Sequence, residues 1–193
     1  MVILASASPR RSELLKKICA DFVVDASDSN EIQIANSPRV LAIKNAMLKA
    51  ESIAKKYPAE NIVIGADTIV VLNGKIFGKP DGEDGAKKML RELAGKKHEV
   101  ITGLAIYTEK KFFTDAEVTE VFFGEMTDAE IAEYVATGEP LDKSGSYALQ
   151  GGAAKFIEKI NGDWSNVVGL PLFRLRMLAK SAGISLDNHA DKI

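Results

Sequence analysis

The chain has very few of the residues that form disulfides and ordinary zinc sites. Its 193 residues include one cysteine, Cys19, and two histidines, His98 and His189. A single thiol excludes an intrachain disulfide and suits a reducing cytoplasm, and within an apolar stretch we expect a core residue rather than a nucleophile. Because nitrogen and sulfur ligands are scarce, we expect any metal to be a hard, oxygen-bound cation such as Mg²⁺ or Mn²⁺.

The chain also lacks an excess of charge and a long apolar run. Its 25 Lys and Arg residues nearly balance 27 Asp and Glu residues, and a formal net charge of −2 leaves no basic footprint for duplex nucleic acid. No apolar run is long enough to cross a bilayer, and the sequence opens on a strand, so we expect neither a membrane span nor a signal peptide. With 46% hydrophobic residues the chain is able to bury a full core, and we expect a single domain over residues 1–193.

What the chain does contain is an alternation of strand and helix patterns, which predicts an α/β fold with a central sheet. The Asn73-Gly74 pair predicts a two-residue hairpin turn, and the glycine-rich segment 142–152 is expected to be irregular. The acidic loop 25–31 is either a lid over a site or a plain connection, and we favour the lid. The predicted helices cover residues 9–20, 38–56, 81–93, 127–138 and 172–181, and the predicted strands cover residues 2–5, 62–72, 75–80, 99–107, 112–123 and 155–160.

A first candidate site follows the N-terminal strand. Ser8 is placed to cap a helix whose first residue is Pro9, and Arg10 and Arg11 fall in its first turn. Cations are unfavourable there because the exposed amides already carry partial positive charge, so we expect an anion beside them. A hydroxyl, backbone N–H groups and two guanidiniums after a buried strand are typical of a phosphate site, although two solvated surface arginines would give the same pattern.

Asp67 is the most anomalous residue, because it interrupts the apolar run 62–72. An unpaired buried carboxylate is strongly destabilising, so Asp67 needs a cation, a hydrogen-bond donor or a catalytic role; a structural Asp bonded to a turn is the alternative. Regular hairpin pairing would put Lys79 opposite Thr68, on the other face of the sheet from Asp67. We therefore predict a one-residue bulge at Gly78 that turns Lys79 toward the Asp67 face.

A hard cation beside Asp67 would need further oxygen ligands. Glu31, in the acidic loop, is the natural partner to test, although a loop glutamate is as readily a solvated side chain. Glu31 and Asp67 are therefore the two carboxylates to test as a metal site.

Six short motifs stand out along the chain, and each of them alone is weak. They are residues 5–11 (ASASPRR), 65–68 (GADT), 78–80 (GKP), 142–147 (DKSGSY), 150–151 (QG) and 168–171 (VGLP). In this order and spacing they resemble the Maf family of nucleoside triphosphate pyrophosphatases over essentially the whole chain.

The resemblance implies a fold like that of inosine triphosphate pyrophosphatases, with an elongated mixed twisted sheet, flanking helices and a nucleotide cleft between two lobes. It also implies hydrolysis between the α and β phosphates with a divalent metal, giving a nucleoside monophosphate and pyrophosphate. By position, Asp67 matches the family's proton acceptor. The family's phosphate and metal site is matched by Ser8, Arg10, Arg11, Glu31, Lys44 and Lys79, and its positions for substrate choice are matched by Arg11, Thr68 and Gln150.

Segments 142–151 and 164–171 look like the branch of the family that acts on dTTP and UTP, with Ser144 and Leu149 as mild variants. The amide of Gln150 suits a pyrimidine, because it can both donate to and accept from the edge of the base. The resemblance also suggests a homodimer, and the alternating residues 117–123 offer an edge surface for a second copy.

Two other functions are compatible with these residues. The family is also associated with septum formation and division arrest, so the chain is alternatively a nucleotide-binding regulator with little turnover. A regulator of that kind would explain the phosphate site, but it would give no function to Asp67 or to the metal. A phosphomonoesterase with the same carboxylate and cations would release orthophosphate. Whether Asp67 acts as a base or as a metal ligand is also open at this point.

Overall fold

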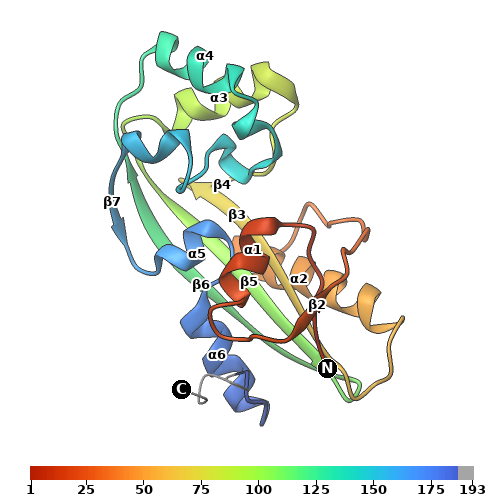
Figure 1. Ribbon diagram of the computed structural model, residues 1–193. Helices are drawn as coiled ribbons and strands as arrows, with labels where there is room; N and C mark the ends of the chain where they lie inside the picture. Colours follow the sequence, from red (N-terminus) through yellow and green to blue (C-terminus); the bar gives the residue numbers. More distant parts are fainter. Residues whose placement is uncertain (187–193) are drawn as a thin grey trace. The chain divides into compact units, whose positions relative to one another are not determined.

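The computed structural model describes residues 1–186 (Figure 1), and His189 lies outside the described residues. The chain divides into two compact units. The first comprises residues 1–67, 102–117 and the part from residue 169 onward, and the second comprises residues 68–101 and 118–168. Three long strands contribute residues to both units, namely β3 (Ile62–Leu72), β5 (Lys97–Thr108) and β6 (Lys111–Phe123).

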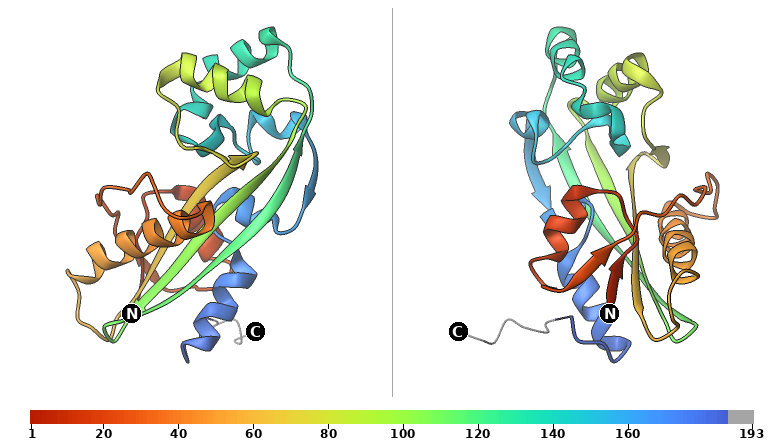
Figure 2. Two further views of the ribbon diagram at one scale, coloured as in Figure 1. Left: turned by 180° about the vertical axis from the view of Figure 1, so that it is seen from behind. Right: turned by 45° about the vertical axis from the view of Figure 1, so that its right-hand side comes forward.

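The first unit is built around the N-terminal strand. β1 (Val2–Leu4) pairs in parallel with β2 (Phe22–Val24) on one side and with β3 on the other. The connection from β1 to β2 contains α1 (Pro9–Leu15), and the connection from β2 to β3 contains α2 (Pro38–Ala54). Right-handed crossovers that run in opposite directions along a sheet place their helices on opposite faces. Accordingly, α2 covers one face, while α1 and α6 (Leu172–Ser181) cover the other (Figure 2).

Helix α2 approaches the sheet closely because small residues lie at the contact. Ala46 and Ala50 of α2 are fully buried in a cluster with residues of β1, β3 and β5. A Cβ added to Gly65 of β3 would overlap the carbonyl oxygen of Ala46, and one added to Gly103 of β5 would overlap the backbone of Ala42. These glycines therefore decide how near the polar side chains of α2 come to β3.

Both Ser-Pro pairs begin helices as predicted. The Ser8 hydroxyl accepts a hydrogen bond from the Arg11 amide at 3.5 Å, and the Ser37 hydroxyl accepts one from the Val40 amide at 3.3 Å. Side-chain oxygens at these positions satisfy amides that have no partner within the helix.

The first helix is shorter than predicted, because α1 ends at Leu15 and the next residues form tight turns toward β2. Cys19 follows these turns and is buried, as the sequence predicts, and burial raises the pKa of its thiol. The buried thiol has the surroundings of a core residue.

In the second unit, β3 turns at Asn73-Gly74 into the antiparallel strand β4 (Lys75–Phe77), which confirms the predicted hairpin. The predicted bulge at Gly78 is wrong, because β4 ends one residue earlier. The Gly78 carbonyl instead accepts a hydrogen bond from the Gly145 amide at 3.1 Å, outside the ladder. Lys79 is exposed beyond the end of the strand.

Helices α3 (Gly82–Leu93) and α4 (Asp128–Ala136) pack on each other in the second unit (Figure 1). The predicted capping box at Thr127 is present at the start of α4. Segment 142–152 contains no α-helix or strand, as expected; one short 3₁₀ turn lies within it and two others overlap its ends. The sequence did not predict helix α5. These elements are η1 (Glu139–Asp142), η2 (Ser144–Ser146), η3 (Gly152–Phe156) and α5 (Trp164–Val168).

The sheet is mixed, and its strand order is β2-β1-β3-β5-β6-β7, with β4 paired to β3. Strand β7 (Ile157–Asn161) pairs antiparallel with residues 120–123 of β6. The edge surface predicted at residues 117–123 is therefore wrong over most of its length, because β7 already occupies that edge.

Candidate active site

A cluster of polar side chains lies in the first unit, beyond the last residue pair between β1 and β3. The chain leaves β1 toward β2 and later returns on its other side as β3, so the direction of the connections reverses beside β1. In open α/β sheets, ligands bind at the carboxyl ends of strands at such a reversal. Ser6 follows β1 there, and Asp67 follows the part of β3 that pairs with β1.

Asp67 is buried and interacts with two residues of α2. The Lys49 ammonium lies 2.5 Å from Asp67 Oδ1, and the Asn45 amide donates to Oδ2 at 3.4 Å. The same ammonium lies 2.7 Å from Glu31 Oε1. The side chains of Asp67 and Lys49 are 7% and 14% exposed, whereas that of Glu31 is 41% exposed, so the cluster opens to solvent at Glu31. The buried carboxylate has a cation and a hydrogen-bond donor, which are two of the partners that the sequence analysis allowed, and both come from α2.

Asn45 also fixes the loop that carries Glu31. Its side-chain oxygen accepts a hydrogen bond from the Ile32 amide at 2.9 Å, and its side-chain nitrogen donates to the Ile32 carbonyl at 3.2 Å. The hydroxyls of Ser27 and Ser52 lie 2.7 Å apart and tie the same loop to α2. The loop is thus fastened along the helix, and its interpretation as a lid stays a prediction.

Arg11 belongs to the same cluster. Its Nε donates to the Gly169 carbonyl at 2.8 Å, and its Nη1 donates to the Ser6 hydroxyl at 3.3 Å. Burial lowers the pKa of the Arg11 guanidinium. The charge of Asp67 raises that pKa, the charge of Arg10 lowers it, and the charge of Glu31 raises it. The charges of Asp67, Arg10 and Glu31 therefore all act on the Arg11 guanidinium, and a single site made by these four residues stays a prediction.

The carboxylates of Glu31 and Asp67 fit Mg²⁺ or Mn²⁺ only if a bound substrate supplies further oxygen atoms. Glu31 and Asp67 are brought within reach of one positive group, the Lys49 ammonium. Within residues 1–186, no three His, Cys, Asp or Glu side chains gather in a way that could hold a metal. Mg²⁺ is commonly bound by one or two carboxylates together with substrate phosphates, so this pair suits a cation that arrives with a polyphosphate.

Lys49 is the site residue that the sequence analysis missed. Lys44, which was predicted instead, is exposed on α2, and it precedes Asn45 by one residue, so it projects about 100° away around the helix. Asn45 and Lys49 are one turn apart, beside the buried Ala46 and Ala50. Two polar residues one helical turn apart, next to small buried residues, were the sequence pattern that could have pointed to Lys49. A phosphate contact by Lys44 stays a prediction.

Three other predicted residues, Thr68, Lys79 and Gln150, belong to the second unit. The Thr68 carbonyl accepts a hydrogen bond from the Ser144 hydroxyl at 2.9 Å, which fastens the 142–147 motif to β3. Lys79 and Gln150 are exposed. Their roles in binding a substrate stay predictions.

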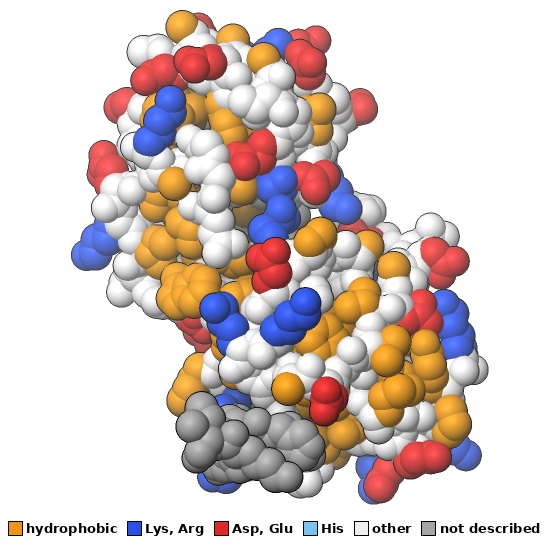
Figure 3. Space-filling view, in the orientation of Figure 1, with side chains coloured by type: hydrophobic (Ala, Val, Ile, Leu, Met, Phe, Trp, Pro, Cys, Tyr) orange, Lys and Arg blue, Asp and Glu red, His pale blue; other side chains and the backbone are white. Residues whose placement is uncertain are grey.

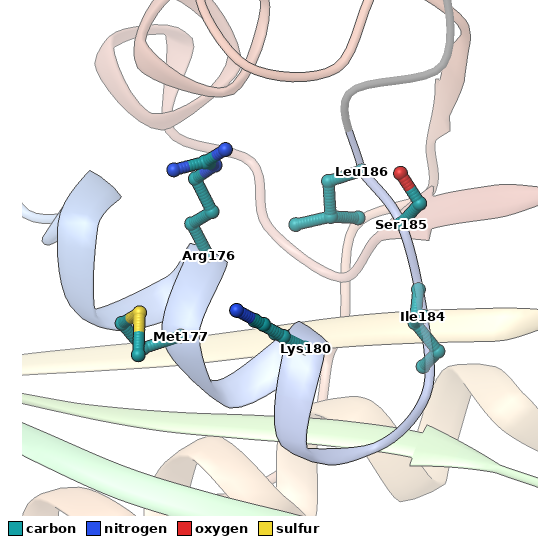
Figure 4. Close-up of a pocket in the computed structure, with 6 residues that line it drawn as sticks. All are labelled: Arg176, Met177, Lys180, Ile184, Ser185 and Leu186. Atoms are coloured by element: carbon teal, nitrogen blue, oxygen red, sulfur yellow. The ribbon is translucent and has the colours of Figure 1, made fainter.

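A hollow of about 280 Å³ lies elsewhere in the first unit, at the end of α6 (Figure 4). It is lined by Arg176, Met177, Lys180, Ile184, Ser185 and Leu186, and so by none of the predicted site residues. Acidic and basic side chains are interspersed over the face drawn in Figure 3. No helix within residues 1–186 combines the length and the apolar character needed to cross a membrane.

The chain is similar to known proteins over most of its length. The model of a family described as Maf-like protein matches residues 1–182. A dTTP/UTP pyrophosphatase from Alkaliphilus metalliredigens is 48% identical over 177 residues, which are 90% of this chain and 92% of that protein. A dTTP/UTP pyrophosphatase from Methanosarcina barkeri is 45% identical over 189 residues, which are 96% of this chain and 95% of that protein.

Among solved structures, a HAM1 protein from Coxiella burnetii matches with a TM-score of 0.50 and 16% identity, over 65% of this chain and 73% of that chain. At this identity the likeness concerns the fold alone. Together with the mixed sheet and its flanking helices, it confirms the predicted α/β fold class.

Proposed function

Because the chain belongs to the Maf-like protein family, we propose that it hydrolyses dTTP and UTP to the nucleoside monophosphate and pyrophosphate. The observation that carries this proposal is the cluster of Arg11, Glu31, Lys49 and Asp67 beyond the paired ends of β1 and β3. It combines a buried carboxylate with cationic groups that suit a polyphosphate.

In the proposed reaction, a water oxygen forms a bond to the α phosphorus, and the bond from that phosphorus to the α–β bridging oxygen breaks. Pyrophosphate leaves with the bridging oxygen, and the proton of the attacking water passes to Asp67. Lys49 and Asn45 hold the two oxygens of that carboxylate in place. Each carboxylate oxygen has more than one acceptor site, so these contacts leave Asp67 able to accept a further hydrogen bond from water.

The arginines are proposed to bind the phosphates and to stabilise the charge that develops on the departing pyrophosphate. Arg11 is already held by the Gly169 carbonyl and the Ser6 hydroxyl, so little reorganisation is needed when the substrate binds. Ser8, Arg10, Lys44 and Lys79 are the further phosphate contacts in this proposal.

Glu31 and Asp67 are proposed to hold Mg²⁺ or Mn²⁺ together with the substrate phosphates. Such a cation, when bound, supplies Lewis-acid polarisation of the phosphate oxygens. Lys49 contacts both carboxylates, so its ammonium competes for the same oxygens. We expect the metal affinity to depend on Lys49 for that reason.

Thr68 and Gln150 are proposed to select the pyrimidine base, with the Gln150 amide both donating and accepting hydrogen bonds. A homodimer and a role in removing unwanted nucleotides or in division arrest are further parts of the proposal, and they rest on the family resemblance. A cytoplasmic location is also proposed, because a single thiol suits a reducing compartment.

The test is the release of pyrophosphate and orthophosphate from a panel of nucleoside triphosphates with Mg²⁺ or Mn²⁺, with Asp67→Asn as the control. Pyrophosphate from dTTP and UTP that is lost in the variant supports the proposal. Nucleotide binding without release would favour a regulator of septum formation, and orthophosphate alone would favour a phosphomonoesterase. Turnover confined to purine nucleotides would contradict the proposed role of Gln150.

A further inference from the structure

Gln150 lies in a tight turn of the second unit. The Gly151 amide donates to the Ala148 carbonyl at 3.2 Å and closes the turn, and the Gln150 side chain is exposed. An exposed amide can read the edge of a base only if its backbone is held in one place, because each competing conformation lowers the fraction that is ready to bind.

Glu139 holds the backbone that follows Gln150. Its Oε2 accepts a hydrogen bond from the Gly152 amide at 3.0 Å. Its carboxylate also packs against Gly151, where an added Cβ would overlap both carboxylate oxygens. The Lys143 ammonium donates to the Glu139 carbonyl at 2.7 Å and ties the same residue to the 142–147 motif.

Tyr134 holds the backbone that precedes Gln150. Its hydroxyl accepts a hydrogen bond from the Ala148 amide at 3.1 Å. The Tyr134 side chain is buried, and a Cβ added to Gly152 would lie 3.1 Å from its ring. Tyr134 of α4 and Glu139 of η1 thus hydrogen-bond the backbone on both sides of Gln150.

We infer that Glu139 and Tyr134 are positioning residues for Gln150, and that through it they set the preference of the enzyme for thymine and uracil over cytosine. The inference rests on the proposed function, because it requires that Gln150 contacts the base. Neither residue is required to touch the substrate. Their removal should therefore weaken the discrimination between bases more than the hydrolysis itself.

The experiment measures kcat and KM for dTTP and for dCTP, two nucleotides that differ at the pyrimidine edge. The variants are Gln150→Ala, Glu139→Ala, Glu139→Gln and Tyr134→Phe. Glu133→Ala is the matched control, since Glu133 is an exposed glutamate of α4. Thermal unfolding of each variant establishes that it is folded before its kinetics are compared.

We expect Gln150→Ala to abolish the preference for dTTP over dCTP, measured as the ratio of their kcat/KM values. Glu139→Ala and Tyr134→Phe should each lower that ratio by roughly tenfold, the usual effect of one hydrogen bond. Glu139→Gln should restore most of it, because the amide oxygen still accepts from the Gly152 amide. Glu133→Ala should leave the ratio unchanged.

Gly151→Ala tests the same contact from its other side. The added Cβ should displace the Glu139 carboxylate and lower the ratio in an enzyme that keeps Glu139. The inference is overturned if Gln150→Ala loses the preference while Glu139→Ala, Tyr134→Phe and Gly151→Ala all keep it. A wild-type enzyme that releases no pyrophosphate from either nucleotide would instead overturn the proposed function.

Discussion

The ammonium of Lys49 lies 2.5 Å from Oδ1 of Asp67 and neutralises the carboxylate that interrupts β3. Both side chains are largely buried, so the pair differs from the exposed ion pairs elsewhere on the chain. Removing one partner of a buried pair leaves an uncompensated charge, which is far more costly than the loss of a surface pair.

Lys49→Met is therefore expected to lower the free energy of unfolding by roughly 3–5 kcal/mol, as urea titration would measure. Lys55→Met is the matched control, because Lys55 is 72% exposed and its pair with Glu51 spans 4.0 Å. Asp67→Asn combined with Lys49→Met should recover part of the loss, since the buried carboxylate is then neutral and the other partner of Lys49, Glu31, is 41% exposed. Equal effects of the two lysine substitutions would contradict the proposed burial of the pair.

Asp67→Asn is expected to reduce pyrophosphate release by about 10²–10⁴-fold, because an amide cannot accept the proton of the attacking water. Binding of a non-hydrolysable dTTP analogue, measured by calorimetry, should persist, because the arginines remain. Turnover close to that of the wild type would show that Asp67 is not the base.

Arg11→Lys is expected to lower kcat/KM for dTTP by roughly 10–100-fold, because lysine cannot reproduce the planar fork that bonds the Gly169 carbonyl and the Ser6 hydroxyl. Arg39→Lys provides the comparison, since Arg39 is 53% exposed and pairs with Asp115. If both substitutions have the same small effect, Arg11 has no special role in binding the phosphates.

Asn45→Ala is expected to loosen the loop that carries Glu31, because both of its hydrogen bonds to Ile32 are lost. Hydrogen exchange over residues 25–32 should become faster, and the concentration of Mn²⁺ needed for half-maximal activity should rise. Asn166→Ala is the control, since Asn166 is also a buried amide that bonds a backbone carbonyl, that of Val100. A similar change in loop exchange in both variants would indicate general destabilisation.

His98 should make the stability depend on pH. Burial lowers its pKa from the ordinary 6.5 to about 4, and its Nε2 lies 2.7 Å from the Tyr147 hydroxyl. Between pH 6.5 and pH 4 the unfolded chain binds a proton that the folded chain does not, so the free energy of unfolding falls as the pH falls, by up to about 3 kcal/mol. At pH values above the ordinary pKa this penalty is absent.

The measurement is urea unfolding of the wild type and of His98→Gln at several pH values from about 4.5 to about 7.5, a range that brackets the ordinary histidine pKa. Carboxylates titrate in both proteins, so the difference between them isolates His98. We expect that difference to change with pH in the stated direction. A difference that is constant across the range would mean that His98 titrates normally in the folded protein.

Local sequence was sufficient for much of the fold. Ser8-Pro9 and Ser37-Pro38 begin helices because hydroxyl caps and proline act within one turn, and Asn73-Gly74 forms its hairpin because both residues adopt positive φ. The anomaly of Asp67 was also readable, since a carboxylate in an apolar strand requires a partner wherever it lies.

Tertiary structure decided which groups meet. Lys49 rather than Lys44 reaches Asp67 because Gly65 and Gly103 let α2 lie close to the sheet, and the rotation of the helix then selects the face that carries Asn45 and Lys49. Just after the end of β4, the Gly78 carbonyl bonds the Gly145 amide, which lies far away in the sequence.

By itself, the sequence determined the caps, the turn and the need of Asp67 for a cation, a hydrogen-bond donor or a catalytic role, because these follow from local backbone chemistry and from the cost of a buried charge. The identity of the partner of Asp67 and the hydrogen bonds that hold the backbone around Gln150 follow from contacts between distant segments, which only the folded chain brings together.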